Sequence, residues 1–325
     1  MRALHVVAML ASVGAQLLHA QTAPTLAHAR QQFEARNYDV ARTEFTALAH
    51  ATPADVRPPL YLGKIALAQN DNDEAVRQLE RCVAIDEQSA ECHLWLGNAI
   101  GSSAQRASKF RQPFLARRVK TEFERAVALD PNSVDARMGL VQFYMLAPGF
   151  MGGSMEKARE HVSEIDKRSK LRGAIGAGML ADHEKNPKDA ATAYQRAIAV
   201  APDSSVGYYS LANVLAREKN WNEAFATLDH LLARIPSETN ALLSIARVAY
   251  VSGEQLDKGE AAAKKWLAAP PPDAATTLQA IAHTRLAGVY EKSGRRDLAR
   301  TEYERAIALN PKYEEAKKAL DALRG

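Results

Sequence analysis

One pattern recurs along the chain about every 34 residues and limits the folds that the chain can adopt. In each copy an aromatic residue is followed three places later by Ala, then three places later by an aliphatic residue, and Pro comes soon after. The clearest copies span residues 123–131, 194–202 and 303–311. Side chains with this spacing lie on one face of a helix, which the Pro brings to an end. The pattern predicts repeated helical hairpins.

A second signature marks the first helix of each hairpin, where a large residue stands beside a small one. The pairs are Leu62-Gly63, Leu96-Gly97, Leu211-Ala212 and Leu286-Ala287. The large residue fills the core, and the small one lets the second helix approach closely. Because aromatic residues make up only 6% of the chain while hydrophobic residues reach 47%, short packed helices are favoured over β-layers. The sequence predicts an all-α fold.

Eight hairpin units can be placed along the chain, over residues 21–312. Their approximate spans are 22–55, 56–89, 90–133, 134–170, 171–204, 205–238, 239–272 and 273–312. An amphipathic helix follows over 313–325, and its Lys and Glu residues suit the exposed end of a stack.

In period and in both signatures, the chain resembles the tetratricopeptide repeat family over nearly all of its length after residue 20. The resemblance implies a right-handed α-solenoid of about eight units with a C-terminal capping helix, and a concave groove that binds a protein or peptide. Residues 96–153 are also similar to a group of exported bacterial repeat proteins whose role is poorly defined. That similarity implies that the protein is exported, and it says little about its activity.

The N-terminus has the layout of a signal peptide. Arg2 precedes an apolar run over residues 3–18, and Leu18-His19-Ala20 has the form of a cleavage site. The alternative is a membrane anchor, but the run is short and is interrupted by polar residues. We expect residues 1–20 to be removed and the mature protein to be periplasmic or secreted. The formal net charge of +4 is too small for a general nucleic-acid binder.

The third unit is about ten residues longer than the repeat and carries a run of cations without an acid. This basic insertion contains Arg106, Lys109, Arg111, Arg117, Arg118 and Lys120. One interpretation is a patch that contacts an acidic partner or, weakly, an anionic membrane surface. The other is a lengthened helix pair with solvated basic faces.

The fourth unit has a long turn over residues 147–154 that contains three glycines. Phe150 and Met151 are candidate apolar anchors for a partner, because insertions in solenoids map to surface loops. A tucked hairpin in which Phe150 covers its own unit is equally compatible with the sequence. The glycine spacing fits no nucleotide-binding motif.

Cys82 and Cys92 are the only cysteines, and they fall on helices expected to be antiparallel neighbours. Facing helices bring Cα atoms within bridging range, and an oxidising compartment favours a disulfide. The alternative is that both are small buried packing residues.

The first helices should line the groove of the stack, and their inward places give the candidate partner contacts. These are Met138, Gln142, Met145, Met179, Tyr209, Asn213, Arg217, Arg247 and Tyr250. Methionines adapt to varied shapes, and Tyr, Asn and Arg can bond a peptide backbone.

The sequence contains no zinc-protease pattern, Cys-x-x-Cys pair or nucleophile elbow. The histidines are scattered at no ligand spacing, which favours solvated or capping roles. We therefore expect no catalytic residue, metal, cofactor or small-molecule substrate. The predicted function is a protein-binding adaptor or scaffold in the cell envelope. Two alternatives stay open: an enzyme with a site built between units, and an assembly factor associated with a membrane surface.

Overall fold

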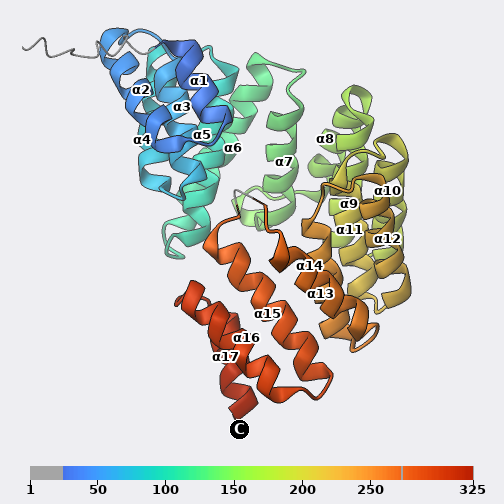
Figure 1. Cartoon of the computed structure of the whole chain (residues 1–325). Coiled ribbons are helices and arrows are strands. Elements are labelled where there is room, and N and C mark those ends of the chain that lie inside the picture. Colours follow the sequence, from blue (N-terminus) through green and yellow to red (C-terminus); the bar gives the residue numbers. More distant parts are fainter. Residues whose placement is uncertain (1–24, 272–273, 325) are drawn as a thin grey trace, which may run out of the picture. The chain divides into compact units, whose positions relative to one another are not determined.

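The computed structural model describes residues 25–271 and 274–324, so the predicted signal peptide lies outside the described residues (Figure 1). Within these ranges every regular element is a helix. In chain order they are α1 (Leu26–Glu34), α2 (Tyr38–Ala51), α3 (Arg57–Ala68), α4 (Asn72–Ile85), α5 (Ala90–Arg106), α6 (Gln112–Leu129), α7 (Val134–Leu146), the short 3₁₀ helix η1 (Gly149–Met151), α8 (Met155–Arg168), α9 (Lys170–His183), α10 (Pro187–Val200), α11 (Ser205–Arg217), α12 (Trp221–Arg234), α13 (Asn240–Ser252), α14 (Leu256–Ala268), α15 (Thr276–Lys292), α16 (Arg296–Leu309) and α17 (Glu314–Arg324).

The chain divides into two compact units between residues 88 and 89. The N-terminal unit contains α1 to α4, and its core gathers around Ala41, Phe45 and Ile65. The C-terminal unit contains α5 to α17. In each unit the helices pack chiefly against their neighbours in sequence, and some first helices also touch the first helix of the next hairpin, as α7 touches α9. The fold is therefore an all-α solenoid of stacked hairpins, as the sequence predicts.

One turn geometry joins the two helices in five of the hairpins. Two places after the end of the first helix, a residue lies in the left-handed region, with φ between 57° and 77°, at Arg36, Asn70, Lys185, Lys219 and Gly294. The next residue donates its amide hydrogen to the carbonyl five residues earlier, at 2.8–2.9 Å. This bond satisfies a carbonyl that the helix end would leave without a partner. The repeated turn is the physical basis of the repeated hairpin.

The large-beside-small signature is explained by how closely the helices pack. The ring of Phe123 in α6 lies against Gly97 of α5 and Gly139 of α7. A Cβ atom added at these glycines would come within 2.8 Å and 2.6 Å of the ring. Glycine is required here by contact rather than by backbone conformation, since neither residue has a positive φ.

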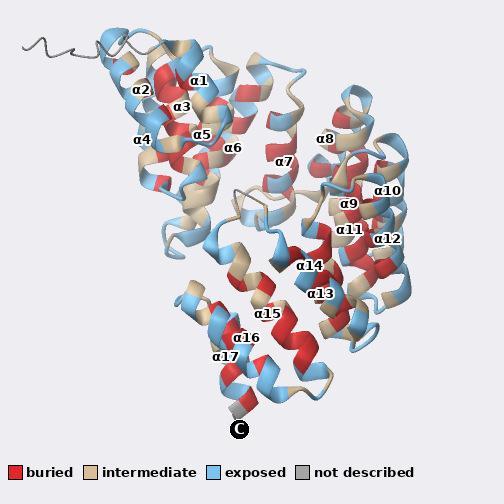
Figure 2. Ribbon diagram, viewed as in Figure 1, coloured by how far each residue is buried: buried red, intermediate tan, exposed pale blue. Residues whose placement is uncertain are grey.

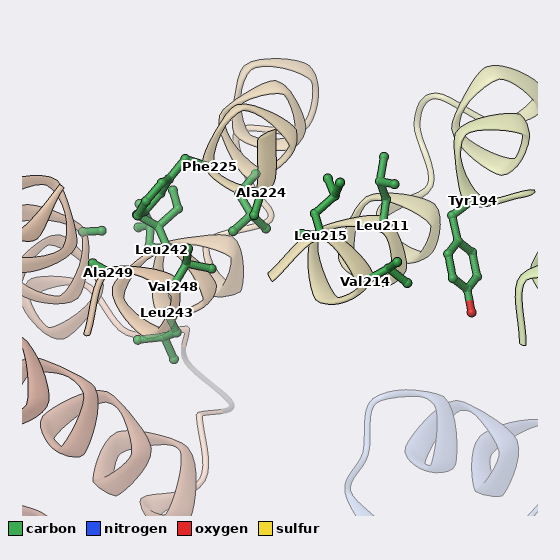
Figure 3. Packing of buried hydrophobic residues seen from close by; sticks show 14 of the residues in the cluster. Tyr194, Leu211, Val214, Leu215, Ala224, Phe225, Leu242, Leu243, Val248 and Ala249 are labelled. Atoms are coloured by element: carbon green, nitrogen blue, oxygen red, sulfur yellow. The ribbon is translucent and has the colours of Figure 1, made fainter. Parts of the chain in front are cut away.

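The largest buried cluster in the C-terminal unit runs from α9 to α15 and includes Phe225, Leu228 and Trp266. Figure 3 shows leucine, valine and alanine side chains of α11 and α13 in this cluster, with Phe225 of α12 and Tyr194 of α10. Buried residues form stripes on the helices, while exposed residues occupy the other faces (Figure 2). Each hairpin therefore buries its apolar face by packing against the neighbouring hairpins.

The basic insertion lengthens two helices rather than forming a long loop. It lies at the end of α5 and the start of α6, which have 17 and 18 residues, whereas the helices of the two preceding hairpins have between 9 and 14. No helix among the described residues combines the length and apolar character needed to span a membrane.

Candidate functional site

A groove of about 410 Å³ opens between α5, α6, α7 and η1 in the C-terminal unit. We call it the α5–α7 groove. Gly97, Gly101 and Gly139 form part of its wall, and the absence of a side chain at Gly97 and Gly139 lets the Phe123 ring pack closely there. Apolar residues supply most of the remaining lining, namely Ala104, Ala116, Val119, Phe123, Phe143, Leu146, Ala147, Pro148 and Met151. The groove brings together two of the predicted contacts, Gln142 of α7 and Met151 of the long turn.

Three carboxamide side chains in the α5–α7 groove have no hydrogen-bond partner within the described ranges. They belong to Asn98 and Gln105 of α5 and to Gln142 of α7. A carboxamide offers both a donor and an acceptor, which is the combination that a peptide group needs. The groove therefore pairs an apolar floor with polar groups that can bond a polypeptide backbone.

Large apolar side chains stand exposed around the same part of the unit. Phe110 is 90% exposed, Phe114 74%, Leu146 65% and Phe150 84%. Such a concentration of exposed apolar groups is typical of contact surfaces. Since Phe150 is so exposed, it does not cover the fourth hairpin.

The long turn is nevertheless a folded structure. Its chain is held by a 2.8 Å hydrogen bond from the amide of Ser154 to the carbonyl of Tyr144. Gly152 has a φ of 99°, and a side chain at Gly153 would overlap the carbonyl of Ala147. These two positions require glycine, and they fix the place of Met151 in the groove.

The cations of the basic insertion surround the same hairpin. Lys109, Arg111 and Arg117 are exposed and make no ion pair with any described residue. Lys120 lies 3.5 Å from Glu124, whereas Arg106 and Arg118 are exposed but have other interactions. The hairpin of α5 and α6, which supplies part of the wall of the α5–α7 groove, is accordingly basic.

Met179, Tyr209, Asn213, Arg217, Arg247 and Tyr250 lie on a different set of helices, namely α9, α11 and α13, to which α15 also belongs. We call their surface the A-helix face. Arg217 pairs with Asp182 of α9, and Arg247 donates to Asn213 of α11. Tyr209 donates to Glu238 at 3.0 Å and Tyr250 to Glu315 at 3.3 Å. The two arginine links join successive hairpins, and Tyr250 links α13 to α17. These polar groups are open to solvent at several points.

The methionines differ in their surroundings. Met138 is 6% exposed and packs against Gly176, so it belongs to the core. Met179 is partly buried against the main cluster, and Met145 is partly exposed. Periodicity places all three on the first helix of a hairpin, but only the packed neighbours decide which of them reaches the surface.

The A-helix face contains one cation that the sequence does not single out, Arg285 of α15. Its positive charge acts on the hydroxyls of Tyr209, Tyr250 and Tyr313. Burial, followed by the charge of nearby Arg247, lowers the pKa of Arg285. No hydrogen bond or ion pair joins its guanidinium to any described residue. An arginine on a first helix has no distinctive spacing, so the sequence carried no signal for it.

Histidines have a role that the sequence did not predict. His93 is buried with its Nδ1 2.6 Å from Glu122, and the same distance separates His283 from Glu302. Each pair joins the two helices of one hairpin, and each Glu directly precedes the recurring aromatic residue. The expectation that histidines are solvated or capping is therefore wrong for these two. Within the described ranges, no group of three His, Cys, Asp or Glu residues could hold a metal ion.

Cys82 of α4 and Cys92 of α5 are both fully buried. Burial is compatible with a disulfide and also with two small packing residues. The disulfide between them stays a prediction.

Stacked hairpins with repeated turns place this chain among the α-solenoids. Residues 26–90, 177–239 and 280–313 match the tetratricopeptide repeat family. The chain is a tetratricopeptide repeat protein. No curated protein matches it.

Three solved structures share the fold at low sequence identity. A thermophilic repeat protein of Thermus thermophilus is 17% identical, with a TM-score of 0.51 over 58% of this chain and 96% of its own. A repeat protein of Parabacteroides merdae is 12% identical, with a TM-score of 0.52 over 83% of this chain and 99% of its own. A chain of the APC/C hetero-tetramer Cut9–Hcn1 is 14% identical, with a TM-score of 0.51 over 92% of this chain and 55% of its own.

Proposed function

We propose that this protein is a non-catalytic adaptor that holds a segment of another protein in the α5–α7 groove. The observation that carries the proposal is the combination of an apolar floor with three unpartnered carboxamides. Apolar side chains of a bound segment would be removed from water, while its peptide groups would bond Asn98, Gln105 and Gln142. The fold is consistent with this role, since a chain of the same fold is part of the Cut9–Hcn1 hetero-tetramer.

Exposed residues of the α5–α6 hairpin and of the long turn indicate the character of the bound segment. Lys109, Arg111 and Arg117 supply positive charge without a neutralising acid, and Phe110, Phe114 and Phe150 supply exposed apolar surface. Opposite charge at the edge of an interface speeds encounter and fixes orientation more than it adds affinity. We therefore expect an amphipathic segment with apolar side chains flanked by acidic ones.

We place this activity outside the cytoplasm, in the periplasm or the medium, because residues 1–20 have the layout of a signal peptide. N-terminal sequencing of the protein recovered from the envelope fraction or the medium tests this. A mature chain beginning at Gln21 is expected. An intact N-terminus on all of the recovered protein would contradict the location.

The binding proposal is tested by site-specific photo-crosslinking in cells. A photo-reactive residue at position 142 faces the groove, whereas one at Leu298, an exposed apolar position in α16, serves as the matched control. A discrete cross-linked protein from position 142 alone is expected. Purified partner should then bind the Gln142→Ala, Phe150→Ala double variant about tenfold or more weakly, since central truncations commonly cost at least about 1 kcal/mol each. Identical cross-links from both positions would contradict the groove.

Two other functions lead to different outcomes. The cations and exposed aromatics of the third unit would also suit an anionic membrane surface. In that case the protein would bind vesicles containing anionic lipid, with an affinity that falls as salt rises. An enzyme would show turnover that one side-chain change abolishes without loss of helicity. Either result, with no protein cross-linked at position 142, would replace the adaptor proposal.

A further inference from the structure

A further cavity, of about 370 Å³, opens between α10, α11 and α12 in the C-terminal unit. We call it the α10–α12 pocket. The α11 side chains that line it, Tyr208, Leu211 and Leu215, are buried and lie on one face of that helix. Tyr209 and Asn213 occupy another face of α11. The pocket is therefore separate from the A-helix face, and none of its residues lines the α5–α7 groove.

The floor of the α10–α12 pocket is apolar. Leu211 and Leu215 belong to the main buried cluster, and Ile198 of α10 packs against that cluster. Ala226 of α12 is exposed at the pocket, where its small side chain leaves room that a larger one would occupy. A short chain of methylene groups lying on this floor would be removed from water, which favours binding.

Tyr208 fixes one wall of the pocket. Its hydroxyl donates to the carbonyl of Pro202 at 3.2 Å, so that this hydrogen is not available to a ligand. The centroid of its ring lies 5.3 Å from that of the His230 ring, and the two planes make an angle of 85°. An edge-to-face contact of this kind is favourable and restricts the imidazole. His230 is consequently held at the pocket, although its side chain is exposed.

The opposite wall is polar and comes from α12. Glu223, Thr227 and His230 share one face of this helix, because they are spaced four and three residues apart. The hydroxyl of Thr227 donates to the carbonyl of Glu223 at 2.8 Å, which leaves the hydroxyl oxygen able to accept. Among the described residues, none forms an ion pair or hydrogen bond with the carboxylate of Glu223 or with the carboxamide of Gln195 in α10.

The pocket offers more hydrogen-bond acceptors than donors. A carboxylate only accepts, the Thr227 hydroxyl has given its hydrogen to the backbone, and an imidazole or a carboxamide includes one acceptor group. The arginines of α10 and α12 are already paired, since Arg196 lies 3.1 Å from Asp166 and Arg234 lies 2.7 Å from Asp203. An ammonium group has three donors and no acceptor. Its charge therefore matches this wall.

We propose that the α10–α12 pocket binds an alkylammonium group, with the ammonium at Glu223 and the carbon chain on Leu211 and Leu215. Thr227 and His230 supply further acceptors. The ligand is the side chain of a lysine in another polypeptide or a free amine, and the chemistry is the same for both. This site is additional to the adaptor function and does not depend on it.

The test is a titration of the whole mature protein, followed by NMR of its isoleucine and leucine methyl groups. The probes are n-butylamine, a free alkylammonium, and acetyl-Ala-Lys-Ala-amide, which presents the same group on a peptide. The controls are 1-butanol, which is neutral, and butanoate, which is anionic. Shifts of the Ile198, Leu211 and Leu215 signals with either ammonium probe are expected, and the probe that causes them identifies the source. Equally strong binding of a control, or no shift with either ammonium probe, would overturn the proposal.

Variants separate this pocket from general surface charge. Glu223→Gln should weaken n-butylamine binding about threefold, as expected for an exposed ion pair. Ala226→Leu keeps the carboxylate but fills the pocket, so it should also weaken binding. Glu156→Gln is the matched control, since Glu156 is likewise an exposed acid in the first turn of a helix, α8. Unchanged binding by either pocket variant, or an equal loss with Glu156→Gln, would contradict the site. The cross-linking at position 142 is unaffected by any of these results.

Discussion

His283 in α15 and Glu302 in α16 lie 2.6 Å apart, Nδ1 to Oε2, and tie the two helices of the eighth hairpin together. Glu302 is buried and also pairs with Arg305 at 2.6 Å. We expect His283→Ala to lower the free energy of unfolding by about 1–3 kcal/mol, because it leaves a buried carboxylate with one partner fewer. Urea denaturation followed by circular dichroism measures the change.

The first hairpin provides the comparison for this pair. His28 lies 2.8 Å from Glu44 in the corresponding arrangement, but its side chain is 51% exposed. His28→Ala should therefore cost about 0–1 kcal/mol. Equal losses for the two variants would show that burial does not set the strength of the pair.

The close packing of Phe123 leads to a second prediction. Gly139→Ala should lower stability by about 1–3 kcal/mol, since the new methyl group would press on the Phe123 ring at 2.6 Å. Gly101→Ala is the matched control in α5, because the nearest atom to its added Cβ is 3.9 Å away. That variant should gain up to about 1 kcal/mol from helix propensity alone. Thermal melts of both variants give the comparison, and a loss of stability in Gly101→Ala would contradict the steric explanation.

The fold could be predicted from the sequence because its determinants are local and repeated. The spacing of Phe123 and Ala126 fixes a helix face, and Pro131 marks its end, whatever the rest of the chain does. The same signals recur at 194–202 and 303–311, so that an error in one unit would not change the fold. The tetratricopeptide resemblance and the all-α solenoid are both confirmed.

The candidate site could be predicted only in part, since it depends on contacts between helices. The sequence singled out Gln142 and Met151 separately, but not that both line one groove with Asn98 and Gln105. Nor could it distinguish Met138, which is buried, from Met145, or find the isolated charge of Arg285. The identity of a residue's neighbours across the stack is not encoded in its own repeat.

The left-handed turn residues lead to a third prediction. A side chain in this region costs about 1–2 kcal/mol, whereas glycine adopts it freely. Lys219, with φ 59°, should therefore gain up to about 1 kcal/mol of stability on substitution by Gly. Gly294→Ala, at the same place in the eighth hairpin, should lose a similar amount. Hydrogen exchange of the flanking helices is the measurement, and a destabilised Lys219→Gly variant would show that the lysine side chain has another role.

The two cysteines give a fourth prediction. Peptide mapping without reductant should recover the peptides of Cys82 and Cys92 joined and two hydrogen masses lighter than their sum. Reduction should lower the free energy of unfolding by about 2–3 kcal/mol, because it releases a short closed loop in the unfolded chain. A Cys82→Ala, Cys92→Ala variant should be insensitive to reductant. Alkylation of either thiol in denaturant without reductant would rule the bridge out.

His161 in α8 gives a fifth prediction, on pH. Burial, and then the charge of Arg137, lowers its pKa in the folded protein from the ordinary 6.5, and nearby carboxylates only partly offset this. As the pH falls through 6.5, the unfolded chain binds a proton at this position before the folded chain does. Stability should therefore fall below that pH and be unaffected by this group above it. Urea unfolding between about pH 5 and 8 should show a flatter profile for His161→Gln, and an unchanged slope would exclude His161 as the cause.

The dependence of each helix on its neighbours has a mechanical consequence. In residues 89–324 each helix packs mainly against the helices next to it in sequence, and the main cluster is assembled from successive helices. A hairpin at one end of the stack can therefore lose its contacts while the remaining hairpins keep theirs. Under tension the C-terminal unit should therefore unfold one hairpin at a time and lengthen in small successive steps. It should not unfold in a single cooperative event.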